Sequence, residues 1–183
     1  MNILEIVKYG HPVLRTKGAR ITTITDELKT LAADMVETMH AANGVGLAAQ
    51  QVGQAIQLAV VDVAGVDDRP SAMRVDGAEV NIDEWMPLTL INPELELSKD
   101  KVPGDEGCLS FPDISGGVLR SVKINVKAQL IDGRQVQFEA EGFLARAIQH
   151  EVDHLNGILF IDRMNSATKV SLSGRLKRLQ KQA

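Results

Sequence analysis

The residues with the clearest chemical potential are two histidines four positions apart, in the sequence His150-Glu151-Val152-Asp153-His154. Residues four apart lie on one face of a helix, so both imidazoles can reach a single metal ion. Glu151 directly follows the first histidine and can reach a water molecule at that ion. This H-E-x-x-H pattern predicts a metal site that activates water, although two histidines on an ordinary helix would produce the same pattern.

A catalytic metal site of this kind needs a third protein ligand and an open position for water. Downstream of His154 the chain has no histidine and no glutamate, and Asp162 is its only acidic residue there. The other candidate is Cys108, the single cysteine, in the segment EGCLS. A thiolate binds divalent metals strongly, whereas a lone cysteine is often a small apolar core residue. The residues alone therefore leave Cys108 and, less favourably, Asp162 as the third ligand.

The composition favours an ordinary globular domain around this site. The chain has 183 residues, of which 44% are hydrophobic and 24% charged, and its formal net charge is −4. A single cysteine excludes a disulfide scaffold, and no apolar run has the length of a membrane span. The mild acidity gives no sign of DNA binding, and the N-terminal residues lack a secretory pattern. We therefore expect one catalytic domain over 1–183, in the cytoplasm and not in a membrane.

Patterns along the chain predict the elements that must position the site. The simplest of them are a helix over 26–42 and strands over 56–63 and 88–97. Apolar residues alternate from 120 to 140 on both sides of an Asp-Gly pair at 132–133, which predicts a hairpin with a two-residue turn. The polar segment 65–87, interrupted by glycine and proline, is expected to be a surface insertion that can hold a short hairpin.

The motif itself should lie on a helix from about Glu141 to Leu155, and a basic C-terminal helix and tail should occupy 168–183. Strands and helices are not regularly interleaved. This order favours an α+β fold over a doubly wound parallel sheet. We therefore expect antiparallel β-sheets packed around a central helix that carries H-E-x-x-H, with a further helix at the C-terminus.

Three segments, taken together and in this order, resemble the peptide deformylase family: GVGLAAQQV at 44–52, EGCLS at 106–110 and QHEVDHLNG at 149–157. The resemblance extends to the segment 9–15, the hairpin over 120–140 and the C-terminal helix, so it covers most of the chain. It implies a metal-dependent hydrolase that removes the N-terminal formyl group from formylmethionyl peptides of newly made proteins and releases formate.

The same resemblance implies a role for each residue around the metal. One divalent ion, Fe²⁺ in the first place with Zn²⁺ or Ni²⁺ as substitutes, would be held by Cys108, His150 and His154. Glu151 would serve as general base and then as general acid. Two hydrogen-bond donors, the side-chain amide of Gln51 and the backbone N–H of Leu109, would stabilise the oxyanion that forms when water attacks the formyl carbonyl.

Substrate contacts follow from the same comparison. An apolar slot for the methionine side chain would be lined by Val45, Phe143 and Ala147, although the same side chains would also suit a simple core face. Gly44 and Gly46 would let the backbone approach an extended peptide closely. Many members of the family carry an arginine shortly after the cysteine segment. This chain has serine and glycine at 115–116 instead, so the resemblance assigns no contact to the peptide beyond methionine.

Further expectations concern the surroundings of the site and the tail. Glu106 is expected to pair with Arg120, and Asp153 is a candidate to orient a histidine ligand. The last acidic residue is Asp162, and six basic residues follow it: Arg163, Lys169, Arg175, Lys177, Arg178 and Lys181. The resemblance implies that this basic helix binds the ribosome; the alternative is a helix that packs its leucines on the domain and leaves its charges in solvent.

Two other functions stay open from the residues alone. One is an endopeptidase of the H-E-x-x-H type, which would use Asp162 or another downstream group as its third ligand. The other is a structural metal site in a binding module without catalytic activity. The small residues from Gly44 to Ala49 favour a cramped site, which would admit a formyl group and exclude a larger acyl group.

Overall fold

The computed structural model describes all residues from 1 to 183. Its helices are α1 (Asp26–Ala41), α2 (Phe143–Leu155) and α3 (Ser166–Lys181). Its strands are β1 (Gly46–Ala48), β2 (Leu58–Val61), β3 (Ser71–Val75), β4 (Ala78–Glu79), β5 (Leu88–Leu97), β6 (Lys101–Cys108), β7 (Phe111–Ser121), β8 (Lys123–Leu130) and β9 (Gln135–Gly142). Four short 3₁₀ turns are η1 (Pro12–Arg15), η2 (Ala49–Val52), η3 (Ile82–Glu84) and η4 (Phe160–Arg163). No helix combines the length and the apolar character that crossing a membrane requires.

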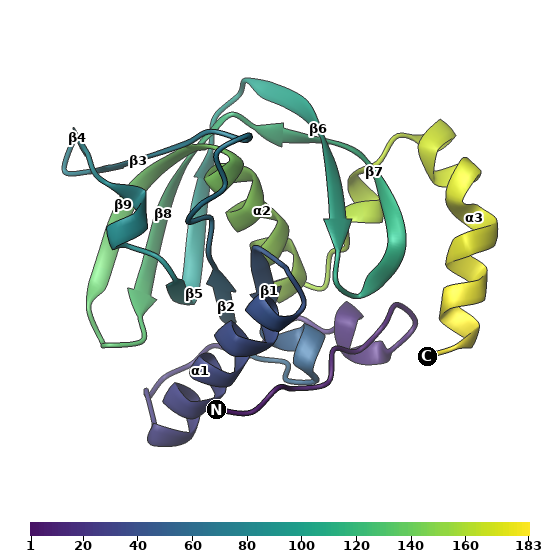
Figure 1. Ribbon diagram of the computed structural model, residues 1–183, viewed down its shortest axis with the longest axis horizontal. Coiled ribbons are helices and arrows are strands. Elements are labelled where there is room, and N and C mark those ends of the chain that lie inside the picture. Colours follow the sequence, from purple (N-terminus) through teal and green to yellow (C-terminus); the bar gives the residue numbers. More distant parts are fainter.

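The strands form two antiparallel sheets, which confirms the predicted α+β class. Seven strands pair in the order β1-β2-β5-β8-β9-β3-β4, and β6 and β7 form a separate two-stranded ribbon. Helix α2 lies in the middle, between the large sheet and the β6–β7 ribbon, and α3 lies on the far side of that ribbon (Figure 1). The H-E-x-x-H helix is therefore central, as the sequence predicts, and α3 is the expected C-terminal helix.

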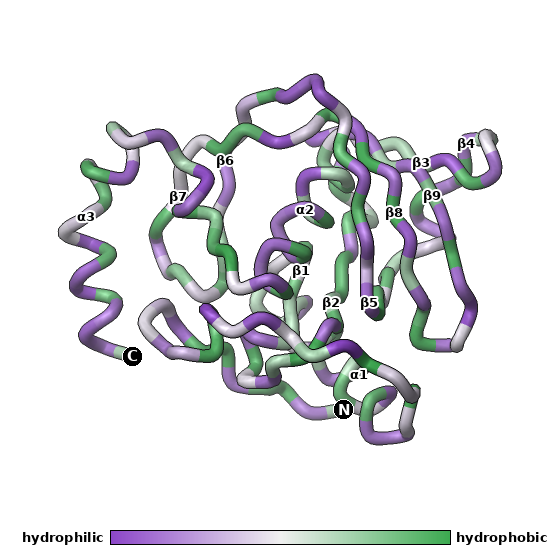
Figure 2. The backbone as a smooth tube through the Cα atoms, turned by 180° about the vertical axis from the view of Figure 1, so that it is seen from behind, coloured by the Kyte–Doolittle hydropathy of each residue, from purple (hydrophilic) through white to green (hydrophobic).

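Three large apolar clusters hold these elements together. The largest lies between the seven-stranded sheet and α2, where Leu144 and Ile148 are fully buried. A second joins α1 to β1 and β2 through Met35 and Met39. The third packs β7, η4 and α3 against one another, and the buried side chains of α3 are Leu172, Leu176 and Leu179. Hydrophobic and hydrophilic residues alternate along α3 in Figure 2, as expected for a helix with one buried face.

The N-terminus of α2 is anchored by a segment far away in the sequence. Gly142 precedes the helix with φ +70°, and a Cβ there would collide with the carbonyl of Pro70. That carbonyl accepts a hydrogen bond from the N–H of Phe143 at 3.0 Å, and Ser71 Oγ accepts one from the N–H of Leu144 at 2.9 Å. Residues 70–71 therefore satisfy two of the free N–H groups at the start of the helix that carries the motif.

The segment 65–87, predicted to be a surface insertion, also contributes a strand to the large sheet. The segment does contain a hairpin, formed by β3 and β4, but β3 also pairs with β9 and extends the large sheet. Met73 is completely buried in the core between this sheet and α2. The strand is only five residues long and polar residues flank it on both sides, so the pattern of 65–87 reveals neither the strand pairing nor the buried methionine.

The hairpin of β8 and β9 is confirmed, but its turn differs from the predicted one. A two-residue turn of the favoured type needs positive φ at both central residues, and only Gly133 has it, with φ +93°. The N–H of Gly133 donates to the carbonyl of Leu130, and the carboxylate of Asp132 accepts from the N–H of Arg134. These bonds stabilise a longer loop. Strand β2 is also shorter than the predicted 56–63, and α2 begins two residues after Glu141.

Candidate active site

The candidate metal centre forms where α2 faces the end of β6. Helix α2 supplies His150 and His154 from one face, and β6 ends at Cys108, directly before the turn that leads into β7. The ligand atoms that these three residues offer all lie within 4.8 Å of one another. The structure thus brings together the three residues that the resemblance implies as ligands, although 42 positions separate Cys108 from His150 in the sequence.

The orientation of the side chains suits a metal ion. Nε2 of His154 lies 3.4 Å from Sγ of Cys108, and Nδ1 of His150 lies 2.8 Å from Oε1 of Glu106. Because a carboxylate only accepts hydrogen bonds, Nδ1 of His150 carries the hydrogen of this bond, which leaves Nε2 as the ring nitrogen that can bind a metal ion. One thiolate and two imidazoles form a donor set that Zn²⁺, Fe²⁺ and Ni²⁺ all accept. The residues present therefore fit a divalent transition-metal ion.

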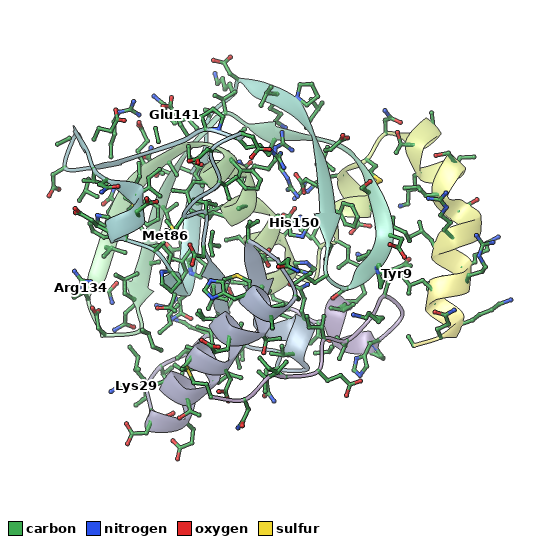
Figure 3. All side chains as sticks on the ribbon, in the orientation of Figure 1. Tyr9, Lys29, Met86, Arg134, Glu141 and His150 are labelled. Atoms are coloured by element: carbon green, nitrogen blue, oxygen red, sulfur yellow. The ribbon has the colours of Figure 1, made fainter.

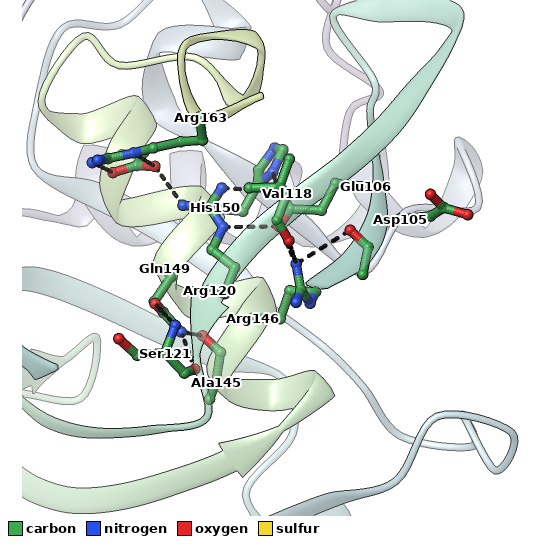
Figure 4. A network of polar contacts seen from close by, with 12 residues as sticks. Asp105, Glu106, Val118, Arg120, Ser121, Ala145, Arg146, Gln149, His150 and Arg163 are labelled. Carbon is green, nitrogen blue, oxygen red and sulfur yellow. Dashed lines mark hydrogen bonds and ion pairs between the residues drawn. The ribbon is translucent and has the colours of Figure 1, made fainter. Parts of the chain in front are cut away.

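A buried ionic network supports His150 from behind (Figure 4). Both carboxylate oxygens of Glu106 accept hydrogen bonds from Arg120 at 2.8 Å, and Oε2 also accepts from Arg146 at 2.8 Å. Burial alone would raise the pKa of Glu106, but the hydrogen bonds from Arg120 and His150 outweigh it and hold this pKa well below its usual range. Glu106 is thus an anion that fixes the ring of His150. The predicted pair with Arg120 is confirmed.

Asp153 does not orient a histidine, contrary to the expectation from the sequence. Its carboxylate binds Arg120 at 2.6 Å and Arg163 at 2.9 Å instead. Asp153 follows His150 by three positions, but these two arginines occupy its carboxylate, and Glu106 is the group that binds Nδ1 of His150. Gln149, also on α2, accepts from the N–H of Ser121 and donates to its carbonyl, which joins α2 to the end of β7 (Figure 4).

Glu151 lies against the metal centre in a closely fitted space. Its side chain is buried, with 4% of the residue exposed, and Oε2 has no hydrogen-bond partner within the protein. A Cβ at Gly46 would overlap the carboxylate, so only glycine leaves room for it there. Burial, with a smaller contribution from the negative charge of Glu106, raises the pKa of Glu151 to about 7. The site therefore holds a carboxyl group that can gain and lose a proton near neutral pH.

Gln51 and Leu109 lie on the other side of Cys108. The side-chain amide of Gln51 is fixed at both ends: Oε1 accepts from the N–H of Ala48 at 3.0 Å, and Nε2 donates to Oγ of Ser110 at 3.2 Å. Nε2 also lies 3.5 Å from Sγ of Cys108. The structure therefore places this amide beside the candidate metal centre, and Leu109 lines the same cavity.

A cavity of about 590 Å³ opens onto these residues. Its walls include every residue that the resemblance implies for the substrate, namely Gly44, Val45, Gly46, Phe143 and Ala147, together with Cys108, His150 and Glu151. Val45, Phe143 and Ala147 form an apolar part of the wall and also pack on the core of the large sheet.

Three basic residues of the cavity wall were not expected from the sequence: Lys8, Arg69 and Arg146. Arg146 precedes His150 by four positions on the predicted helix, so the helical spacing could have placed it on the same face. Lys8 and Arg69 come from segments without a motif, and nothing in their neighbourhood indicates the site. Lys8 Nζ donates to the carbonyl of Leu109 at 3.1 Å.

Asp162 takes no part in the metal centre. Its carboxylate binds Arg15 at 2.5 Å and accepts from the N–H of Leu159 at 2.9 Å. The group of metal-binding side chains contains Cys108 and does not contain Asp162. The endopeptidase alternative, which would use Asp162 as a ligand, therefore receives no support from the geometry.

The fold and this site define the class of the protein. An α+β domain buries an H-E-x-x-H helix against a cysteine ligand, with a carboxyl group beside the metal position and a cavity in front of it. Such a set of groups binds a divalent metal ion and activates water against an acyl group, which is the chemistry of a metal-dependent hydrolase.

Comparisons with known proteins identify the family. Residues 3–170 match the family model described as polypeptide deformylase. A peptide deformylase of Methylacidiphilum infernorum is 46% identical over 179 residues, which cover 98% of this chain and 94% of that relative. The crystal structure of peptide deformylase from Thermotoga maritima has a TM-score of 0.76 at 38% identity, covering 90% of this chain and 99% of that one. A peptide deformylase from Synechococcus elongatus, solved in complex with actinonin, has a TM-score of 0.80 at 36% identity, and the match covers 97% of this chain and 87% of that one.

The chain belongs to the polypeptide deformylase family. It is an enzyme that removes the N-terminal formyl group from nascent peptides, and the prediction from its three sequence motifs is confirmed. The metal dependence of the family agrees with the cluster of Cys108, His150 and His154.

Proposed function

We propose that this enzyme deformylates formylmethionyl peptides with Fe²⁺ as its native metal, held by Cys108, His150 and His154. The convergence of three ligand atoms within 4.8 Å carries this proposal. A divalent ion there would supply Lewis-acid chemistry, which makes water a stronger acid and polarises a carbonyl group. Zn²⁺ and Ni²⁺ fit the same donor set and are the substitutes we expect. A thiolate and ferrous iron are both easily oxidised, which supports a place in the reducing cytoplasm.

Glu151 moves the protons of the reaction in this proposal. Its carboxylate takes a proton from the attacking water and later returns a proton to the nitrogen of the leaving amine. The buried position of Glu151, with Oε2 unpartnered and Gly46 leaving it room, supports this role. The proton transfers and the departure of the amine convert a formamide and water into formate and a free N-terminus.

Two donors stabilise the oxyanion that develops on the formyl carbonyl. The side-chain amide of Gln51 and the N–H of Leu109 are the donors we propose. Gln51 is suited to this task because Ala48 and Ser110 hold its amide in one orientation before any substrate arrives. Preorganised donors need no rearrangement during the reaction, which is the main source of their effect.

The substrate side chain is placed by the apolar part of the wall. We propose that the methionine side chain lies between Val45, Phe143 and Ala147. The reacting end is narrow, because the carboxylate of Glu151 fills the space that a side chain at Gly46 would occupy. An acetyl group carries one methyl group more than a formyl group and should collide there.

Formate release tests this function. Iron-loaded protein, kept anaerobic, should release formate from formyl-Met-Ala-Ser and leave acetyl-Met-Ala-Ser almost untouched at equal concentration. Mass spectrometry should find only loss of the formyl group. Comparable rates on the two peptides, or cleavage of an internal peptide bond, would contradict the proposed substrate.

We propose further that the exposed face of α3 binds the ribosome. Its leucines are buried, whereas Lys169, Arg175, Lys177, Arg178 and Lys181 are exposed, and no acidic side chain lies on the helix. Replacing Arg175, Lys177, Arg178 and Lys181 by glutamine leaves the buried leucines intact. This variant should sediment less with ribosomes while retaining activity on short peptides, and wild-type binding should weaken steeply with salt. Unchanged sedimentation would dismiss the proposal and leave α3 as a solvated helix.

A further inference from the structure

Arg69 is a cation at the cavity whose function the reaction chemistry does not explain. It lies just before β3 and lines the same cavity as the candidate metal centre. Its Cζ atom lies 4.1 Å from the centroid of the Phe143 ring, in the geometry of a cation–π contact. Phe143 also belongs to the proposed methionine slot, so Arg69 lies against one wall of that slot.

The position of Arg69 is set by a rigid part of the fold. The two residues that follow it bind the start of α2: the carbonyl of Pro70 accepts from Phe143, and Ser71 Oγ accepts from Leu144. Strand β3 then pairs with β9 from Ser71 onward. Arg69 therefore belongs to a segment that is anchored on the same helix that carries His150 and Glu151, and its guanidinium is presented at a defined place.

Most N–H donors of the Arg69 guanidinium have no acceptor within the protein. No carboxylate lies within ion-pair distance of Arg69, although Asp67 and Asp68 are close in sequence. Its one hydrogen bond within the protein, from Nη2 to the carbonyl of Asp105, is long at 3.4 Å. A guanidinium carries five N–H donors in a planar fork that matches a carboxylate. Arg69 thus has the chemistry to bind an anionic group of a ligand.

The geometry of an extended peptide indicates which group that is. Strand β1 is the edge strand of the large sheet, and its Gly46 lines the cavity, so an extended peptide can lie along it. In an extended chain, side chains two positions apart point to the same face, roughly 7 Å from each other. When the first side chain, methionine, enters the slot beside Phe143, the third side chain lies on the same face, toward Arg69. The second side chain points the opposite way.

We propose that Arg69 is a specificity-determining residue that favours an acidic side chain at the third position of the formylated peptide. This inference rests on the proposed placement of methionine beside Phe143. Asp105 and Asp113 also line the cavity, and Glu106 neutralises Arg146, so the cationic character is local to Arg69 and Lys8. The preference should therefore be confined to the one peptide position that meets Arg69.

The test compares kcat/KM for four peptides, formyl-Met-Ala-Glu, formyl-Met-Ala-Gln, formyl-Met-Glu-Ala and formyl-Met-Gln-Ala, each with an amidated C-terminus. For wild-type protein we expect kcat/KM to be roughly two- to fivefold higher with glutamate than with glutamine at the third position, which is the size expected for an exposed ion pair. At the second position we expect no difference in kcat/KM between glutamate and glutamine. The preference should shrink as salt is raised. Arg69→Gln should bring the third-position ratio to one.

Two further variants separate charge from packing. Arg69→Lys keeps the positive charge and should retain part of the preference for glutamate over glutamine at the third position. Arg134→Gln removes a charge at the tip of the β8–β9 hairpin, far from His150 in Figure 3, and should leave the ratio unchanged. If Arg69 only covers Phe143, then Arg69→Gln will change kcat/KM for all four peptides by the same factor. That result, or a wild-type ratio of one, would overturn the proposal, whereas cleavage of none of the peptides would contradict the proposed substrate instead.

Discussion

Replacing Glu106 by glutamine removes the anion on which the buried network depends. The side chains of Glu106, Arg120 and Arg146 are 5%, 4% and 8% exposed, so their charges are almost fully withdrawn from water. In Glu106→Gln the two arginines keep only Asp153 as a carboxylate partner, and Asp153 already binds Arg163. Removing one partner of a buried ion pair typically costs about 3–5 kcal/mol.

That cost corresponds to a large thermal shift. In a domain of this size 1 kcal/mol moves Tm by about 2–4 °C, so Glu106→Gln should lower Tm by about 6–20 °C. Arg120→Gln should cost less, because Glu106 keeps Arg146 and Asp153 keeps Arg163. Thermal unfolding with a chelator present isolates this effect from metal binding. Glu96→Gln is the matched control on the surface and should stay within about 0.5 kcal/mol of wild type.

The metal affinity of the same variants provides a second measure. Loss of the group that orients a histidine ligand commonly lowers metal affinity about 10- to 100-fold. Glutamine can still accept a hydrogen bond from His150, so the lower part of this range is expected for Glu106→Gln. The reasoning fails if Glu106→Gln unfolds within about 1 kcal/mol of wild type, or if Arg120→Gln is the more damaging change.

Three other substitutions test the chemistry at Glu151. Glu151→Gln should keep its metal, measured by elemental analysis, and lose roughly 10²–10⁴-fold in kcat for formate release, since a proton-transfer group is removed; near-normal turnover would exclude Glu151 from the mechanism. Gly46→Ala should approach the same loss, because the added Cβ displaces the Glu151 carboxylate. Gly44→Ala, whose closest contact would be the flexible end of Leu109 at 2.8 Å, should be milder, and the reverse order would refute this account of Gly46.

Features carried by local patterns could be predicted from the sequence. The helices α1 and α2, strand β5 and the β8–β9 hairpin follow apolar periodicity closely, because each buries one face. Beside the two histidines, the candidates for the third metal ligand could be narrowed to Cys108 and Asp162. The three family motifs then pointed to Cys108. The long-range convergence of these residues is consistent with that choice.

Other features depend on contacts between distant segments. The partner of His150 is Glu106, 44 positions away, and the expectation that Asp153 orients a histidine failed because Arg120 and Arg163 bind its carboxylate instead. Strand β3 is short and surrounded by polar residues, so its pairing with β9 leaves no periodic signal. Arg69 comes to the cavity only through that pairing, and for the same reason the sequence alone does not place it there.

The metal content of Cys108→Ala tests the central claim most directly. Wild-type protein and the variant are reconstituted anaerobically with Fe²⁺, dialysed in parallel and analysed for iron per chain and for formate release from formyl-Met-Ala-Ser. Because Cys108 supplies one of three ligands, we predict one ion per chain in the wild type and severe loss of both iron and activity in the variant. A Cys108→Ala protein with a full complement of iron and undiminished formate release would contradict the assignment of the metal centre.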